Sequence, residues 1–451
     1  MKGLRNLLLV AYHFPPHGGS GVQRALKLAR YLPPAGWRAH IITAGHDHYP
    51  VLDRTLCAEY ADANVERVPG WEPGALAKHM AAPLPPLFKR SCCGLEDRLY
   101  WRLDRWMRRL PLAELEQLWV SAAARRARHM IREHAIEAVI TTSPPCATHL
   151  VGRNLQRRMG IPWIADLRDP IVDNFSYRPK TSGEDRFFER LEATIAQEAD
   201  RVVVTCPELA ECLRERYRNV PAERFTTITN GYDPADAPAA VQRANSGRFT
   251  LAHVGAFYRE QTVGPILDAV RQLRATRPEI RDALRLRLVG TLSASERARL
   301  LPEDHTFLDH AGYVDHRTAI EEMASADILL LTTPASDGGR LCIPAKTFEY
   351  LAFGKHMIAS LHYSSWISRT IQQAGNCTVM LCAGAAEWAN AIESCFVTWN
   401  AGRLQQPRDR AVVDAFRRDR IAARYARVIE EAIAEVRLSR AEVLCANEAV
   451  A

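Results

Sequence analysis

The sequence has no run of eighteen or more apolar residues, although 47% of its 451 residues are hydrophobic. About eighteen is the shortest stretch that indicates a membrane-spanning helix, so none is expected. The apolar run from Leu7 to Ala11 is too short for a secretory signal and soon meets His13, Pro15 and Pro16. We therefore expect a cytoplasmic protein.

Cysteine pairs with the spacing of metal ligands are also lacking. The chain has eleven cysteines, including the adjacent Cys92 and Cys93, but no paired C-x-x-C motifs. In a cytoplasmic protein this pattern favours reduced thiols over disulfides or zinc. The sequence predicts no metal site.

A dinucleotide-binding fingerprint is incomplete as well. The strand-like run from Leu7 to Ala11 is followed by Gly18, Gly19 and Gly21 and by an apolar helical stripe from Val22 onward. The loop lacks the full G-x-G-x-x-G pattern, and no acidic residue suited to a ribose ends the second strand. A nicotinamide site is therefore disfavoured. The glycines either form a tight turn or allow the backbone to approach a phosphate closely.

What the sequence does have is two successive α/β patterns. A chain of this length exceeds what one core usually supports, which predicts two domains. Strand-like runs separated by helical patterns occupy residues 7–11, 39–43, 138–142, 162–165, 201–205, 249–254, 286–289, 327–331 and 356–360. This alternation predicts an α/β protein with two Rossmann-like, doubly wound domains.

Turn residues mark the boundary between these domains. Thr229-Asn230-Gly231-Tyr232-Asp233-Pro234 precedes a polar, Pro/Ala-rich stretch that runs to Gly247. We expect an N-terminal domain at residues 1–235 and a C-terminal domain at residues 246–405. A helical segment at residues 411–435 and a frayed tail at residues 437–451 should follow.

The segment Ile343-Pro344-Ala345-Lys346-Thr347-Phe348-Glu349 opens a predicted helix, after the run at residues 327–331 and the loop Asp337-Gly338-Gly339-Arg340. Amides at a helix N-terminus and a glycine-rich loop favour an anion, and Lys346 adds a full positive charge. Glu349 lies one turn further on the same helix face, where a carboxylate can accept both hydroxyls of a ribose. These residues predict a nucleotide diphosphate site.

Two further loops follow neighbouring strands of the first domain. Ser143-Pro144-Pro145 ends one strand, and Arg168 and Asp169 end the next. The carboxyl ends of parallel strands meet at one sheet edge, where open α/β sheets bind ligands. Arg168 and Asp169 either contact a ligand there or cap the loop as a pair. His149 lies on an apolar helical pattern and is either a ligand or a core histidine.

These motifs resemble retaining glycosyltransferases of the two-lobed GT-B fold, particularly family-4-like enzymes of bacterial cell-surface polysaccharide synthesis. The resemblance covers residues 7–429 and is most specific at residues 343–355, 143–169 and 230–233. It implies two Rossmann-like domains facing across a cleft, with the nucleotide mainly on the second domain. It also implies that Glu349 holds the ribose and that the loop from Gly18 to Gly21 lies near the donor diphosphate and the acceptor.

Some residues that are usual in this family are missing. In the family the glycine matching Gly255 is followed by an arginine and, six residues later, by a lysine, where this chain has Ala256 and Thr262. Leu341 replaces a frequent glutamate, and Arg168 stands where many members have a histidine that contacts the donor sugar.

The missing charges must be supplied elsewhere, because a pyrophosphate leaving group needs a cation. Arg259, Arg340 and Lys346 are the nearest candidates by sequence. Asp169 is the candidate for orienting sugar or acceptor hydroxyls.

The resemblance implies transfer of a sugar from a nucleotide-diphosphate-sugar donor to a glycan or lipid-linked acceptor, usually with retention and without a metal or other cofactor. In such enzymes the leaving phosphate helps to deprotonate the acceptor. One alternative is a non-catalytic nucleotide-sugar-binding subunit, which the missing residues favour. The other is a nucleotide-sugar epimerase, which would need acid and base groups poised for proton transfer.

Positive charge is concentrated in one segment of the chain. The net charge is +7, and residues 89–132 alone contain eleven Lys or Arg against five Asp or Glu. Residues 97–110 predict a helix whose apolar face holds Leu99, Leu103, Trp106, Met107 and Leu110 and whose basic face holds Arg98, Arg102, Arg105 and Arg109. This helix either packs on the first domain or docks on anionic lipid headgroups at the inner face of the cell membrane. No nucleic-acid-binding motif accompanies it, so nucleic acid is not an expected partner.

Overall fold

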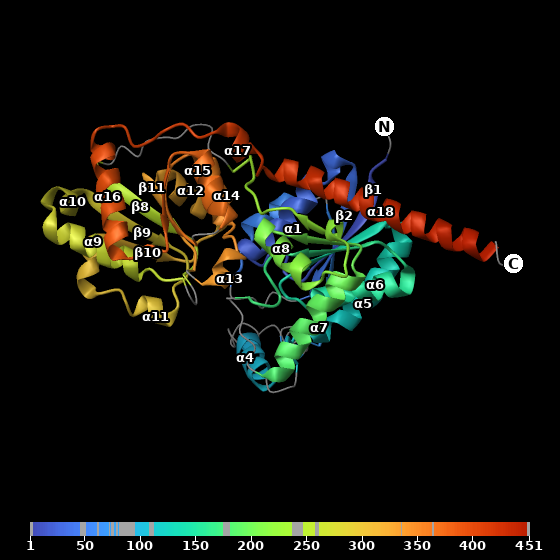
Figure 1. Ribbon diagram of the computed structural model, residues 1–451. Coiled ribbons are helices and arrows are strands. Elements are labelled where there is room, and N and C mark those ends of the chain that lie inside the picture. Colours follow the sequence, from blue (N-terminus) through green and yellow to red (C-terminus); the bar gives the residue numbers. More distant parts are fainter. Residues whose placement is uncertain are drawn as a thin grey trace. The chain divides into compact units, whose positions relative to one another are not determined.

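The computed structural model describes residues 3–45, 51–60, 63–71, 73, 76–77, 80, 95–107, 112–174, 181–236, 247–257, 261–334, 336–362 and 365–448. The chain forms two compact units, each an α/β structure (Figure 1). Unit 1 comprises Met1–Asp173, Arg178–Ile228 and Ile421–Ala451, and unit 2 comprises Asn174–Tyr177 and Thr229–Arg420.

A seven-stranded parallel sheet forms the centre of unit 1, in the order β3-β2-β1-β4-β5-β6-β7. Its strands are β1 (Arg5–Ala11), β2 (Trp37–Ala44), β3 (Asn64–Val68), β4 (Ala138–Ser143), β5 (Trp163–Leu167), β6 (Arg201–Val204) and β7 (Phe225–Thr227). The chain builds outward from β1 to β3 and then returns to place β4 on the other side of β1. Ligands of open α/β sheets bind at the carboxyl ends of the strands where the order reverses, so the loops after β1 and β4 are candidate ligand loops.

Helices pack on both faces of this sheet. In β1, Leu7 and Leu9 pack in one core with α1 (Ser20–Tyr31) and α18 (Arg418–Glu448). Leu8 and Val10 pack in another core with α5 (Gln117–Glu133) and α6 (Thr148–Met159). Because both faces are covered, the strand reads as a continuous apolar run. Unit 1 also contains the helices α4 (Leu95–Met107), α7 (Ser182–Glu198) and α8 (Pro207–Arg216).

The last helix returns the end of the chain to unit 1. Ile421, Tyr425 and Ile429 of α18 are buried in the same core as α1, and Figure 1 shows α18 in red beside α1. The helix runs without a break to Glu448. The described part of the tail from Arg437 onward is therefore helical.

Unit 2 is built on a six-stranded parallel sheet in the order β10-β9-β8-β11-β12-β13. Its strands are β8 (Phe249–Val254), β9 (Leu284–Val289), β10 (Leu308–Gly312), β11 (Ile328–Thr332), β12 (His356–Leu361) and β13 (Cys377–Leu381). Its α-helices are α9 (Gly264–Thr276), α10 (Pro278–Ala283), α11 (Ala294–Arg297), α12 (His316–Ser325), α13 (Asp337–Arg340), α14 (Lys346–Phe353), α15 (Trp366–Ala374), α16 (Ala385–Asn400) and α17 (Arg410–Asp414). Here the strand order reverses between β8 and β11, so the loops after these two strands are the candidate ligand loops.

The predicted order of strand, glycine loop and helix is confirmed in unit 2. A loop containing α13 leads from β11 to α14, which begins at Lys346. A Cβ at Gly339 would overlap the carbonyl oxygen of Pro334, so only glycine fits this loop. Gly354, with a φ of 68°, ends α14 in the left-handed conformation that glycine favours. The two parallel sheets with their helices confirm the expected pair of Rossmann-like domains.

Candidate functional site

The loop after β1 enters α1 through Gly18 and Gly19. The Gly18 amide donates to the carbonyl oxygen of Val51 at 2.8 Å, so that amide is already occupied. Gly19 has a φ of 83°, and no side chain caps the helix that follows. The amides of Ser20 and Gly21, in the first turn of α1, donate to none of the residues that the structure describes. Such free first-turn amides suit an anion.

Arg168 connects this loop to the end of β5. Its Nη1 donates to the carbonyl oxygen of Gly21, and a Cβ at Gly21 would lie 3.3 Å from that nitrogen. The Arg168 carbonyl oxygen in turn accepts from Thr205 Oγ1 at 2.7 Å. Two predicted site residues, Gly21 and Arg168, are thus brought together at the carboxyl edge of the unit 1 sheet.

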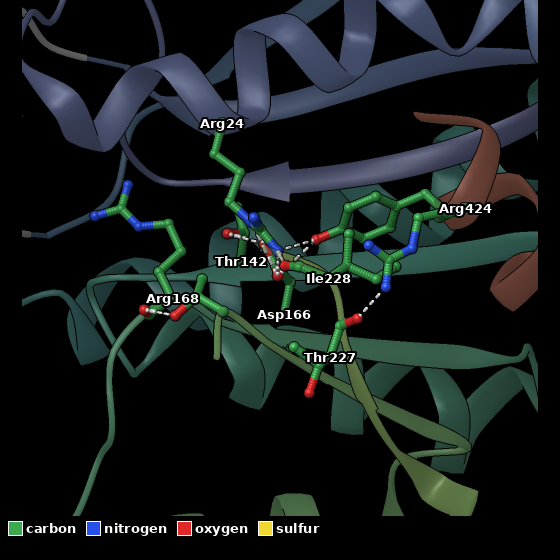
Figure 2. Close-up of polar contacts among 9 residues, drawn as sticks. Arg24, Thr142, Asp166, Arg168, Thr227, Ile228 and Arg424 are labelled. Atoms are coloured by element: carbon green, nitrogen blue, oxygen red, sulfur yellow. Dashed lines mark hydrogen bonds and ion pairs between the residues drawn. The ribbon is translucent and has the colours of Figure 1, made fainter. Parts of the chain in front are cut away.

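Directly below lies a buried polar cluster that the sequence analysis missed. Figure 2 shows Asp166 of β5 facing Arg24 of α1, with Nε 3.0 Å from Oδ2 and Nη2 2.8 Å from Oδ1. Thr142 Oγ1 donates to Oδ2 at 2.8 Å, and the Tyr425 hydroxyl of α18 donates to Oδ1 at 2.7 Å. Burial opposes ionisation of Asp166, but Arg24 and these donors hold its pKa below the ordinary value.

The same cluster fixes the end of the sheet and the returning helix. Arg24 Nη2 also donates to the carbonyl oxygen of Ile228 at 2.8 Å, and Arg424 of α18 donates to that of Thr227 (Figure 2). Arg24 therefore links Ile228, just after β7, to α1, and Arg424 links Thr227, within β7, to α18. The cluster is too deep to meet a ligand and supports the loops above it, since the side chains of Arg24 and Asp166 are each only 2% exposed.

His149 lies inside the protein, as a core histidine would. Its ring is fully buried, and Nδ1 is 2.8 Å from Thr141 Oγ1, which also accepts from Trp163 Nε1 at 2.8 Å. Nε2 has no hydrogen-bond partner among the described residues. Burial lowers the pKa of His149 to about 4, which keeps the ring neutral. The structure favours the core alternative over the ligand alternative for this residue.

Asp169 lies near the loop after β4, where another carboxylate caps α6. Glu114 accepts from the amides of Cys146 and Ala147 at 3.0 and 2.6 Å. Burial and nearby Glu116 raise the pKa of Glu114 to about 7. Asp169 is half-buried, and its carboxylate makes no hydrogen bond within the described chain. Of these two carboxylates, Asp169 is the one left to meet a ligand.

In unit 2, Lys346 lies against the end of β8. Its Nζ is 2.7 Å from Nε2 of His253, and a Cβ at Gly255 would lie only 2.8 Å from Nζ. Gly255 itself has a φ of 134°. Burial lowers the pKa of Lys346 to about 7, although nearby Glu349 opposes the shift. The predicted residues Lys346 and Gly255 are brought together, and His253 is a partner that the sequence analysis did not single out.

Glu349 follows one turn later on α14 and is half-buried. Its neighbour Tyr350 is fully buried and accepts from the amide of Val254 at 2.8 Å. This bond fixes α14 on β8, so the helix that carries Lys346 and Glu349 is anchored to the strand that ends at Gly255.

The remaining predicted residues of unit 2 lie on the loop before α14. Ile343 is buried and Pro344 is half-buried, and the carbonyl oxygen of Pro344 accepts from Thr347 in the first turn. Arg340, the last residue of α13, is half-buried and forms no hydrogen bond or ion pair with the described residues. Arg259 lies outside the described residues.

The basic helix α4 presents a different face from the one expected. Trp101 and Trp106 are 60% and 61% exposed, and Arg102 and Arg105 are exposed between them. These four side chains line a surface hollow of about 300 Å³. Of the predicted apolar face, Met107 is buried but Trp106 is exposed, and Asp104 is buried beside Met107.

Among the described residues, neither a metal-binding cluster nor a membrane-spanning helix is present. No group of three or more His, Cys, Asp or Glu side chains there is arranged to hold a metal ion. No helix there is both long and apolar enough to cross a membrane.

Comparison with known families finds a match to the first part of the chain. Residues 18–231 match the family described as Glycosyl transferase 4-like domain. No curated protein sequence matches the chain.

Solved structures match over nearly the whole chain. Sucrose-phosphate synthase from Thermosynechococcus elongatus has a TM-score of 0.64 at 16% identity, covering 96% of this chain and all of that one. Anabaena HepE in complex with UDP-glucose has a TM-score of 0.56 at 12% identity, covering 98% and 99%. WaaG, a glycosyltransferase of lipopolysaccharide biosynthesis, has a TM-score of 0.55 at 14% identity, covering 94% and 99%. At these identities the likeness shows the fold, which is GT-B.

Proposed function

We propose that this chain, which its 4-like domain identifies as a glycosyltransferase, moves a sugar from a nucleotide-diphosphate-sugar donor to a glycan or lipid-linked acceptor. The observation that carries the proposal is the position of Lys346 against Gly255, the glycine that follows β8, one helical turn before Glu349. A cation beside a strand-end glycine, with a carboxylate one turn later, suits a diphosphate followed by a ribose.

Unit 2 would hold the nucleotide. Lys346 would neutralise the diphosphate in place of the arginine and lysine that Ala256 and Thr262 replace. Arg340, which forms no ion pair with the described residues, would add a second cation. Glu349 would accept the ribose hydroxyls, and Ile343 and Pro344 would shape the loop beside the nucleotide.

Unit 1 would supply the acceptor side. The free amides of Ser20 and Gly21 suit a phosphate or sugar oxygen, and Arg168 places a guanidinium beside them. Asp169 would orient sugar or acceptor hydroxyls with its unpaired carboxylate.

The proposed reaction retains the anomeric configuration. The bond between the anomeric carbon and the phosphate oxygen breaks, and a bond to the acceptor oxygen forms on the same face. The acceptor proton passes to the leaving phosphate. About one further negative charge develops on the leaving diphosphate as this bond breaks, and Lys346 would stabilise it in the transition state.

The similar structures suggest which donor and acceptor to test first. The Anabaena HepE structures are complexes with UDP and with UDP-glucose, and WaaG is involved in lipopolysaccharide biosynthesis. We therefore propose a uridine or guanosine diphosphate sugar as donor and a cell-surface glycan or its lipid-linked precursor as acceptor. The exposed tryptophans and arginines of α4 would hold the enzyme at the cytoplasmic face of a membrane that carries such an acceptor.

Incubation of the purified full chain with UDP-glucose and with GDP-mannose tests the proposal. Slow release of nucleoside diphosphate and free sugar, lost in Glu349→Ala, supports a transferase. Isomerised nucleotide sugar would indicate an epimerase instead. Binding without any turnover would indicate a non-catalytic subunit, and no binding would reject the site.

A further inference from the structure

The His253 ring is held in one orientation and one tautomer. It is buried in β8, its Nδ1 is 3.0 Å from the carbonyl oxygen of Leu330 in β11, and it stacks on Phe257 with centroids 3.9 Å apart. A carbonyl oxygen only accepts, so Nδ1 carries the proton. Nε2 is then a lone-pair acceptor, and Lys346 Nζ donates to it at 2.7 Å.

A second proton on this ring is disfavoured. The ring is fully buried, and burial holds the pKa of His253 well below its ordinary range. His253 therefore acts on Lys346 as a neutral, fixed acceptor that determines where Nζ lies.

Among the described residues, Lys346 has few contacts that stabilise a positive charge. It lies beside His253, which is neutral, Gly255, and Phe257, whose ring centroid is 6.0 Å from Nζ in a weak cation–π contact. On its own helix, Tyr350 is turned to the backbone of Val254, and Glu349 is the charged neighbour. Lys346 makes no ion pair with a described carboxylate, and its pKa near 7 agrees with this setting.

We propose that His253 positions Lys346 so that the lysine takes up a proton from solvent when a nucleoside diphosphate binds. This inference rests on the proposed function, since it assumes that the diphosphate lies at Lys346. In the free site the amine donates one N–H to His253 and needs no charge. In the complex the diphosphate oxygens stabilise an ammonium, and the added proton becomes a further donor to them. His253 is a positioning residue and does not itself contact the ligand.

The sign of the pH dependence follows from this cycle. Binding raises the pKa of Lys346, so protons are taken up wherever the free lysine is neutral and the bound one charged. Below about pH 6, Lys346 should add no pH dependence to the affinity for the diphosphate. Above pH 7 that affinity should fall, approaching tenfold per pH unit. Measurements between pH 7.5 and 9 avoid the terminal phosphate of the ligand, which ionises near pH 6.

Titration calorimetry of the full chain with UDP and with GDP, at pH 8 in buffers of different ionisation enthalpy, measures the uptake directly. We expect nearly one proton taken up per diphosphate bound and none with uridine or guanosine. Lys346→Arg should abolish uptake, because a guanidinium stays charged. His253→Phe keeps an aromatic ring on Phe257 but removes the acceptor, and should weaken diphosphate binding while nucleoside binding is unchanged.

Three outcomes distinguish proton uptake by Lys346, the positioning role of His253 and the nucleotide site itself. Binding of UDP or GDP without proton uptake, or with uptake that Lys346→Arg leaves intact, would overturn this inference while leaving the nucleotide site standing. Equal losses of diphosphate and nucleoside in His253→Phe would show that His253 only supports the fold. If neither diphosphate binds, the proposed function fails and this inference falls with it.

Discussion

The carboxylate of Asp166 and the guanidinium of Arg24 form a two-point ion pair inside unit 1, with nitrogen to oxygen distances of 3.0 and 2.8 Å. Asp166 ends a central strand, and Arg24 lies on the helix that follows the glycine loop. The pair therefore holds the loop from Gly18 to Gly21 in a fixed relation to the carboxyl edge of the sheet. Tyr425 extends the same contact to α18.

Replacing one partner of this pair should destabilise unit 1 strongly. Asp166→Asn leaves Arg24 charged and buried without its counter-ion, which costs about 3 to 5 kcal/mol in comparable buried pairs. Urea unfolding of the variant and the parent, followed by circular dichroism, measures the difference. Asp169→Asn, three residues further along the chain, is the matched control, and its half-buried carboxylate should contribute less than about 0.5 kcal/mol.

The same pair predicts a loss of stability in acid. The pKa of Asp166 is lowered in the folded state, so its contribution is complete above the unfolded-state pKa of about 3.9 and is lost as the pH falls below that value. Between pH 5 and pH 3, the stability difference between the parent and Asp166→Asn should therefore narrow. If the stability difference between the parent and Asp166→Asn stays constant down to pH 2, the carboxylate of Asp166 is not ionised in the folded protein.

The sequence patterns predicted the centre of each sheet but not its edges. The strands they missed are β3, β7, β10 and β13, the four edge strands of the two sheets. Central strands are covered on both faces and read as apolar runs. Edge strands are less covered, as in Leu308–Gly312, where half-buried and exposed positions alternate, so no apolar run marks them.

Site residues divide in a similar way. Glycine loops and the Lys346 to Glu349 spacing are local signals, and the structure places them at the carboxyl edges as expected. His253 and Tyr425 were missed because their partners Lys346 and Asp166 are 93 and 259 positions away in the chain. No local pattern encodes such a contact.

Glu349→Ala tests the ribose contact. Loss of hydrogen bonds from a charged acceptor should weaken UDP binding by about 1.5 to 3 kcal/mol while the fold is retained. Titration with UDP and with 2′-deoxy-UDP separates the cause, because the deoxy ligand should lose less on the same substitution. Exposed Glu303→Ala is the control and should bind like the parent. Unchanged UDP affinity in folded Glu349→Ala would remove the assignment.

Lys346→Ala tests the diphosphate contact. Without the cation, UDP affinity should fall by about 1.5 to 3 kcal/mol, whereas uridine, which carries no phosphate, should bind as before. Arg340→Ala should show the same selectivity with a smaller loss, because no hydrogen bond to the described residues fixes Arg340, whereas His253 fixes Lys346. Equal losses for both ligands would mean that these residues support the loop and never touch phosphate.

The exposed face of α4 predicts binding to anionic vesicles. Arg102→Gln with Arg105→Gln removes two charges and leaves both tryptophans in place. Binding at low salt should weaken by about 2 kcal/mol, since each basic residue near an anionic surface contributes about 1 kcal/mol. Sedimentation with phosphatidylglycerol-containing vesicles measures this. The parent's own binding should weaken as salt rises.

The two tryptophans of α4 should contribute a part of the vesicle-binding free energy that salt does not screen. Trp101→Ser with Trp106→Ser should weaken binding equally at low and high salt, because indole burial at the interface does not depend on charge. Arg297→Gln with Arg317→Gln, on exposed helices of unit 2, is the matched charge control and should bind like the parent. Because the altered side chains of α4 are exposed, thermal stability should be unchanged in both α4 variants. A parent that ignores anionic vesicles, or an arginine variant that binds them as tightly as the parent does, would make α4 ordinary domain surface.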